Sequence, residues 1–246
     1  MATWIAHLRI AENLLRTFPE LDRCAFSIGN VAPDSGIPNE DWTVFTPPTS
    51  VTHFMENGEC KDLTFLHEYL HPLRKDHFGE IETSFRVGYF CHLVADNLWR
   101  FLIGRPTKAN HPEKFDADPN FIWTVKDDWY ALDFVYVRSH PDSLYWTDFL
   151  NCKCPPITIP FLLEEGVRQR VDYIKTYYLR EDDEIEDLLQ QPRVYLHEAE
   201  INEYVDRSSR ALEIILDSAL ASGFMLPETA NSLLSLVPLN LKAPLF

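Results

Sequence analysis

Residues 85–100, FRVGYFCHLVADNLWR, place the strongest constraint on what this chain can fold into. Their apolar residues recur at helical spacing and predict a helix that faces a core: Val87, Phe90, Cys91, Val94, Ala95 and Leu98. His92 and Asp96 are four residues apart, which places them on adjacent turns of one helix face. An imidazole beside a carboxylate is half of a metal site. Such a pair is also common as a hydrogen-bonded core pair, so the question is whether the chain supplies further ligands.

Helical patterns also fill most of the remaining sequence. They lie at 2–16 (with Thr3 as a candidate cap), 61–71, 78–103, 122–138, 141–150, 158–178 and 195–222, where Gly223 is a candidate cap before a last short helix from Pro227. The chain of 246 residues has 17 Pro and only 8 Gly, and it shows no internal repeat and no series of strands. We therefore expect an all-α fold, a multi-helix bundle of about seven helices in a single domain that spans residues 1–246.

Charge and cysteine content exclude several classes of partner. The chain has 38 acidic against 22 basic residues, a net charge of −16, which argues against nucleic acid and anionic membranes. There is no run of 18 apolar residues and no basic leader, so we expect no signal peptide and no integral membrane association. The odd count of 5 Cys, with Cys91 on a core helix, predicts a reduced, cytoplasmic protein. Cys152 and Cys154 form C-x-C without a second pair, which does not indicate zinc.

Further candidate ligands lie elsewhere in the sequence. His7 lies beside the apolar face of the first helix, Asp34 lies in a Pro-Asp turn, and His53 lies in a loop flanked by apolar residues. Asp128 lies in a later helical segment. Each of these side chains alone is compatible with a packed, hydrogen-bonded residue of the core.

Four segments taken together resemble the zinc-dependent phospholipase C family, of which the chain would be a divergent, cytosolic bacterial member. They are AHLRIAE at 6–12, GNVAPD at 29–34, THF at 52–54 and GYFCHLVAD at 88–96. The resemblance covers residues 6–100, and the helical remainder, 101–246, carries no matching motif. It implies an α-helical fold in which Asp34, His53, His92 and Asp96 bind one ion, and His7 binds a second ion that Asp96 bridges.

This set of ligand types suits Zn²⁺, and Fe or Mn²⁺ could also be held. One or two such ions would activate water for attack on a phosphoester, either a phospholipid-like substrate or a smaller one. Asp34 is the candidate to take the proton from that water. The sequence does not specify an oligomeric state.

The chain also departs from the family. The family's phospholipases ligate a metal through the amine of an N-terminal Trp, whereas Trp4 is internal here. The family's later His ligands after the residue equivalent to Asp96 are missing, and Asp127, Asp128 or His111 are candidates to complete a further metal site. The candidates for binding substrate are Arg100, Lys126 and Asp128. Arg86 is a further candidate for neutralising a phosphate. All four are also compatible with ordinary surface or helix residues.

Two rival functions remain open. His67, Glu68 and His71 fit the H-E-x-x-H signature of zinc metalloproteases. Pro72 follows directly, however, and disfavours helical geometry at His71, so an ordinary surface helix is the alternative. The third class is a non-catalytic helical protein with a structural metal or none. These hypotheses differ in which candidate ligands lie close together in the folded chain. The hydrolase requires His7, Asp34, His53, His92 and Asp96 to converge, the protease requires His67 and His71, and the non-catalytic protein requires neither set.

Overall fold

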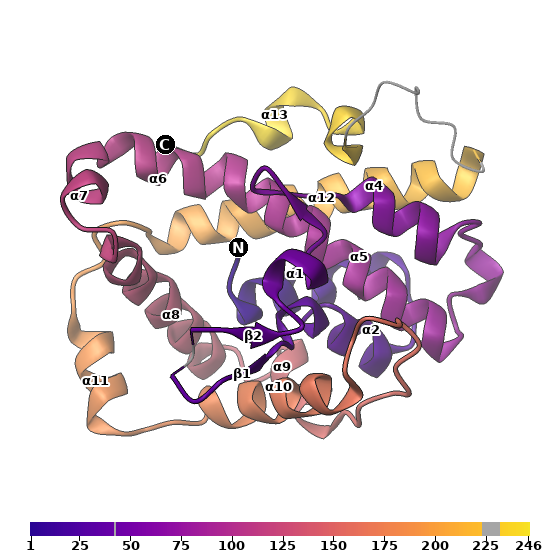
Figure 1. Ribbon diagram of the computed structural model, residues 1–246, viewed down its shortest axis with the longest axis horizontal. Helices are drawn as coiled ribbons and strands as arrows, with labels where there is room; N and C mark the ends of the chain where they lie inside the picture. The colour runs from indigo at the N-terminus through magenta and orange to yellow at the C-terminus, as the bar shows by residue number, and fades with distance from the viewer. Residues whose placement is uncertain (42, 223–231) are drawn as a thin grey trace.

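The structure is a computed structural model that describes residues 1–41, 43–222 and 232–246, and it is mostly helical (Figure 1). The α-helices are α1 (Trp4–Thr17), α2 (Arg23–Gly29), α3 (Thr49–Thr52), α4 (Asp62–Phe65), α5 (Ile81–Trp99), α6 (Arg105–Asn110), α7 (Pro112–Ala117), α8 (Phe121–Ser139), α9 (Leu144–Thr147), α10 (Glu164–Tyr177), α11 (Asp183–Gln190), α12 (Glu198–Ser222) and α13 (Leu239–Lys242). The mostly helical prediction is confirmed. The helices outnumber the seven expected, because short helices of four to six residues occupy several connections.

Short helical turns and two small sheets complete the described chain. The 3-10 turns are Ala32–Asp34, Lys75–His77, Phe149–Asn151 and Leu233–Leu236, and the π-helical turns are Leu66–Leu70 and Arg100–Gly104. Strands β1 (Ile37–Pro38) and β2 (Phe45–Thr46) pair antiparallel, as do β3 (Met55–Glu56) and β4 (Glu59–Cys60). Each strand has two residues, so the sequence carries no extended alternating pattern that would reveal it.

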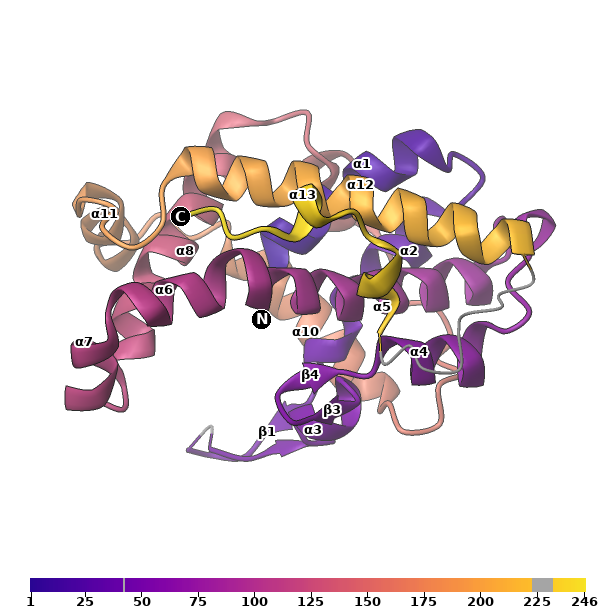
Figure 2. The ribbon, with the colours of Figure 1, turned by 90° about the horizontal axis from the view of Figure 1, so that it is seen from above.

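Helix α5 forms the centre of the hydrophobic core. The six apolar residues predicted to face the core are all at most 1% exposed. Tyr89, Leu93 and Trp99 on other sides of the helix are equally buried, because a helix that is apolar all round is covered all round. Figure 2 shows α12 running beside α5, and shows α3 with the two small sheets on one side of this pair.

Two glycines bring α2 and α5 into close contact. A β-carbon on Gly29 would collide with the carbonyl oxygen of Phe85, and one on Gly88 would collide with the carbonyl oxygen of Phe26. Both positions therefore require glycine for the approach of the two backbones. This contact holds the chain just after α2 against the middle of α5, where His92 lies.

Several expected helix boundaries differ in the structure. The helix expected to end before Gly104 continues through a π-helical turn into α6, since Pro106 lies in the first turn of α6, where a missing N–H costs little. The helix expected from 158 begins only at Glu164. Thr3 does cap α1, because its hydroxyl accepts a hydrogen bond from the Ala6 amide. The expected Gly223 cap and the helix from Pro227 lie outside the described residues.

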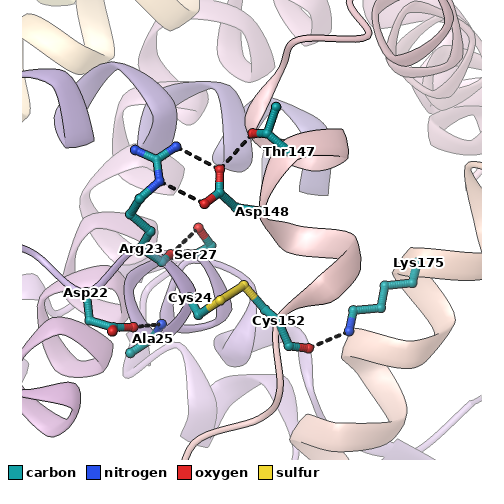
Figure 3. The surroundings of a disulfide bond; sticks show 9 residues. All are labelled: Asp22, Arg23, Cys24, Ala25, Ser27, Thr147, Asp148, Cys152 and Lys175. Atoms are coloured by element: carbon teal, nitrogen blue, oxygen red, sulfur yellow. Dashed lines mark hydrogen bonds and ion pairs between the residues drawn. A yellow bond between two sulfur atoms is a disulfide. The ribbon is translucent and has the colours of Figure 1, made fainter.

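The prediction of a fully reduced chain is wrong. Cys24, in the first turn of α2, forms a disulfide with Cys152, which follows the 3-10 turn after α9 (Figure 3). The ion pair between Arg23 and Asp148 (2.7 Å) and the hydrogen bond from Lys175 Nζ to the Cys152 carbonyl flank the same junction (Figure 3). The remaining thiols, Cys60, Cys91 and Cys154, are free. None of the described helices is long and apolar enough to cross a membrane.

Candidate metal centre

Five of the residues singled out in the sequence converge at one place in the core. His7 comes from α1, Asp34 ends the first 3-10 turn, His53 follows α3, and His92 and Asp96 come from α5. The three imidazoles are fully buried and Asp96 is 4% exposed. Their ligand atoms form two groups that could hold a metal ion and that share His92: His7, His92 and Asp96, and Asp34, His53 and His92.

Three of these ligand atoms, from His53, His92 and Asp96, are spaced like three corners of a tetrahedral zinc site, and Asp34 lies beside His53. His53 Nε2 lies 3.2 Å from His92 Nε2, 3.4 Å from Asp34 Oδ1 and 3.6 Å from Asp96 Oδ2. His92 Nε2 lies 3.5 Å from Asp96 Oδ2. Ligands bound tetrahedrally at about 2.0–2.1 Å from zinc are about 3.3–3.4 Å apart. The separations therefore match a first coordination sphere.

His7 extends the cluster on the other side of Asp96. Its Nε2 lies 3.5 Å from Asp96 Oδ1, and its ring stacks on that of His92 at 3.8 Å between centroids. The Ala2 amide donates to the same Oδ1 at 2.7 Å. Within the described residues, both ring nitrogens of His7 and Asp96 Oδ2 are buried without a hydrogen-bond partner. Such orphaned polar atoms are rare in protein interiors, and a cation among them would satisfy them.

Hydrogen bonds around the cluster orient the candidate ligands. His92 Nδ1 lies 2.8 Å from the Asn30 carbonyl, so it carries the proton and leaves the Nε2 lone pair facing the cluster. His53 Nδ1 lies 3.1 Å from the Thr52 hydroxyl. The indole N–H of Trp4 donates to Asp34 Oδ2 at 2.9 Å, which leaves Oδ1 for His53. These outer contacts match the support that metal ligands usually receive.

The electrostatics of His7, Asp34 and Asp96 favour metal-binding protonation states. Burial opposes a charge on His92, yet Asp96 outweighs it and raises the pKa of this imidazole. Burial and the neighbouring His92 lower the pKa of His7 from 6.5 to about 4, so its imidazole is neutral at neutral pH. Burial opposes ionisation of Asp96, yet the adjacent positive end of the chain and the imidazoles hold its pKa well below the ordinary value. Burial likewise opposes ionisation of Asp34, but the hydrogen bond with His53 and the charges of His92 and His53 together outweigh it, so the pKa of Asp34 is also lowered. Neutral imidazoles and ionised carboxylates are the forms that bind metals.

The candidates for a further metal site lie apart from this cluster. The Asp128 carboxylate is buried and accepts hydrogen bonds from the amides of Val194 and Tyr195, at 2.8 and 2.5 Å, and from Leu196 at 3.3 Å. It anchors the chain before α12. Asp127 is exposed on α8 and His111 packs edge-on against Tyr195. Neither belongs to a metal-capable group among the described residues.

The candidate substrate-binding residues also separate. Lys126 lines a cavity of about 460 Å³, and Asp34 is the one member of the five-residue cluster that lines it too. Asp128 and Arg100 do not line this cavity. Arg100 instead forms an ion pair with Glu59 at 3.4 Å, and Arg86 forms one with Glu82.

The H-E-x-x-H segment does not form a metal group. His67 lies in a π-helical turn, while His71 lies beyond it with an extended ψ of 133°. Both are exposed and their ring centroids are 6.2 Å apart. In the described part of the chain, neither residue belongs to a metal-capable group. Pro72 has the effect on His71 that the sequence predicts.

Sequence reasoning missed much of the cavity next to Asp34. Its walls include Trp4 from α1, Trp123, Trp129 and Tyr130 from α8, and Arg170, Tyr173 and Tyr177 from α10. The i, i+4 spacing of Tyr173 and Tyr177 places both rings on one face of α10. That spacing and the three aromatic residues of α8 were the only signals of the cavity in the sequence. Nothing in the sequence indicates that α8 and α10 lie beside Asp34.

Comparison with family models, curated proteins and solved structures gives no match. The resemblance to zinc-dependent phospholipase C therefore stays a prediction.

Proposed function

We propose that this chain is a metal-dependent hydrolase that acts on a phosphoester, a distant relative of zinc-dependent phospholipase C with one or two zinc ions in the cluster. The observation that carries the proposal is the set of three ligand atoms, from His53, His92 and Asp96, that lie 3.2–3.6 Å from one another. The Asp34 carboxylate lies 3.4 Å from His53 and also lines an open cavity. Structural zinc sites are closed by protein ligands, whereas catalytic sites keep access to solvent or substrate.

The roles of the chain's own residues follow from this geometry. When bound, zinc would supply Lewis-acid activation of water and of a phosphoryl oxygen. His53, His92 and Asp96 would hold one ion, and His7 with Asp96 Oδ1 would hold a second. Asp34 faces the cavity, where its carboxylate meets an incoming water and accepts the proton that the water loses. Trp4 fixes the orientation of this carboxylate through its indole N–H.

Metal content measured by mass spectrometry tests the proposal. We expect one or two zinc, iron or manganese ions per wild-type chain, and none in His53→Ala/His92→Ala. The matched control is His67→Ala/His71→Ala, which removes two exposed imidazoles and should keep the metal. Metal-loaded wild-type protein should then hydrolyse members of a phosphoester panel, and His53→Ala/His92→Ala should not.

Three results would point elsewhere. Wild-type protein that binds no offered metal would end the enzyme proposal. Loss of metal in the His67/His71 variant would favour the metalloprotease. Metal retained in the cluster without turnover of any phosphoester would identify a structural metal in a non-catalytic protein.

A further inference from the structure

The cavity beside Asp34 is large enough for a small molecule. Its volume of about 460 Å³ lies within the range of about 300–1,000 Å³ that is usual for small-molecule sites. The start of α1, the faces of α8 and α10, and Phe45 of β2 line it. A ligand in this cavity therefore contacts both the candidate metal centre and elements that lie outside it.

Aromatic rings dominate the walls. Six of the lining residues carry rings from the start of α1, α8 and α10: Trp4, Trp123, Trp129, Tyr130, Tyr173 and Tyr177. Trp123 is 58% exposed, which is unusual for the largest apolar side chain. Exposed planar faces of this kind stack on planar ligands.

Two cations share these walls, and neither is neutralised. Lys126 Nζ lies 4.4 Å from the centroid of the Trp123 ring, and the Arg170 guanidinium carbon lies 5.3 Å from that of Trp4. In the part of the chain that the structure describes, no carboxylate oxygen lies within 4.0 Å of the charged nitrogens of either residue. Among the described residues Arg170 Nε is buried without a hydrogen-bond partner, while its Nη2 donates to the Gly36 carbonyl at 3.5 Å.

This arrangement is unexpected for such an acidic protein. With 38 acidic and 22 basic residues, many arginines elsewhere have a carboxylate partner, as Arg23 and Arg180 do. Burial lowers the pKa of Lys126, but the charges of Asp34 and Asp96 raise it, so Lys126 lies within electrostatic reach of the metal centre. Two unpaired cations near two carboxylate ligands favour a ligand whose anionic group reaches the metal.

We infer that the cavity binds a small phosphoester that carries a planar aromatic group, with the chemistry of a mononucleotide. The aromatic group stacks on the rings of α8 and α10, and Lys126 and Arg170 contact the phosphate. This inference rests on the proposed function and names its substrate class. A quaternary ammonium headgroup is disfavoured, because the two cations that line the cavity, Lys126 and Arg170, would repel it. A long polynucleotide is disfavoured by the net charge of −16.

Isothermal titration calorimetry on the zinc-loaded full chain tests the inference, with four probes: AMP, adenosine, ribose 5-phosphate and phosphocholine. We expect AMP to bind at least about tenfold more tightly than each of the others, since only AMP offers both a ring and a phosphate. Equal binding of AMP and ribose 5-phosphate would overturn the aromatic assignment. Tighter binding of phosphocholine would overturn the exclusion of cationic headgroups.

Variants locate the binding. Lys126→Gln and Arg170→Gln should each weaken AMP binding about tenfold, which corresponds to one charge-assisted hydrogen bond, and Trp123→Ala should weaken AMP more than ribose 5-phosphate. Arg100→Gln is the matched control, because Arg100 lies outside the cavity and should leave the affinity unchanged. Unchanged AMP binding in both cation variants would overturn the inference.

Repeating the titrations on chelator-treated protein separates the two proposals. If the protein proves not to be a hydrolase, the aromatic rings and the two cations of the cavity should still bind AMP weakly. Lys126→Gln and Arg170→Gln should each weaken this residual binding. If instead the metal-loaded protein hydrolyses ribose 5-phosphate or phosphocholine faster than AMP, the hydrolase proposal stands and the substrate class is wrong.

Discussion

Asp62 and Asp96 are both buried carboxylates, but their oxygens have very different neighbours. Asp62 accepts hydrogen bonds from the amides of Leu63 and Leu233, the Ser232 hydroxyl and the Asn97 side chain. Asp96 receives one hydrogen bond, from Ala2, and its Oδ2 receives none although imidazoles of His53 and His92 lie 3.5–3.6 Å away. The first carboxylate is satisfied by the protein itself. A cation would satisfy the second, and this difference separates a structural acid from a candidate ligand.

Among the tests of this comparison, removing the metal should change the free energy of unfolding the most. Folded protein at a free metal concentration of 1,000 times the Kd gains about 4 kcal/mol, and we expect chelation of wild-type protein to remove that stabilisation. Asp96→Asn should unfold at the same denaturant concentration with and without zinc, because the shared ligand is lost. Denaturant unfolding with and without chelator measures both, and superimposable wild-type curves would contradict the assignment of Asp96.

Asp62→Ala should lower the free energy of unfolding by about 3 kcal/mol, because several buried donors lose their acceptor. The loss should be the same in zinc-loaded and chelated protein, and metal content should stay at the wild-type level. Asp62→Asn is the matched variant and should lose less, since it retains one acceptor oxygen. A loss of metal in Asp62→Ala with the fold intact would show that the two carboxylates are not independent.

Asp133 is intermediate, and its effect is expected as a slope of stability with pH. Its oxygens accept hydrogen bonds from Thr3 and Tyr178, and burial raises its pKa from 3.8 to about 7. Between these values the folded chain holds a proton that the unfolded chain has released. Stability is therefore fully present below about pH 3.8 and is lost as the pH rises through about 7, by at most about 1.4 kcal/mol per pH unit.

Asp133→Asn should flatten this dependence, since an amide does not titrate. The free energy of unfolding is measured from pH 4 to 8 for both proteins, and the contribution of Asp133 is the difference between the two slopes. Parallel curves would mean that Asp133 does not change its protonation on folding.

The sequence predicts the helices better than it predicts the site. The spacing of apolar residues in 85–100 predicts α5 and its buried residues, because helical periodicity is a local property. His92 and Asp96 follow from the same spacing. Their convergence with His7, Asp34 and His53 was expected only from a resemblance, since side chains far apart in sequence carry no local signal of contact.

Other features had no local signal at all. Asp128 occupies the same kind of helical position as a functional acid, and only the folded chain shows that three amides before α12 use its carboxylate. Cys24 and Cys152 are 128 residues apart, and an odd cysteine count predicts neither partner. The disulfide also disagrees with the expected cytoplasmic location, because disulfides are rare in reducing compartments.

That disulfide makes residues 24–152 a closed covalent ring. Asp34, His53, His92, Asp96 and Lys126 lie within the ring, whereas His7 and Arg170 lie on the two arms that leave it. A protease cut at a single exposed bond inside the ring would open it but leave all parts of the chain joined. The metal centre would thus be assembled from pieces that remain one molecule until the sulfur–sulfur bond is reduced.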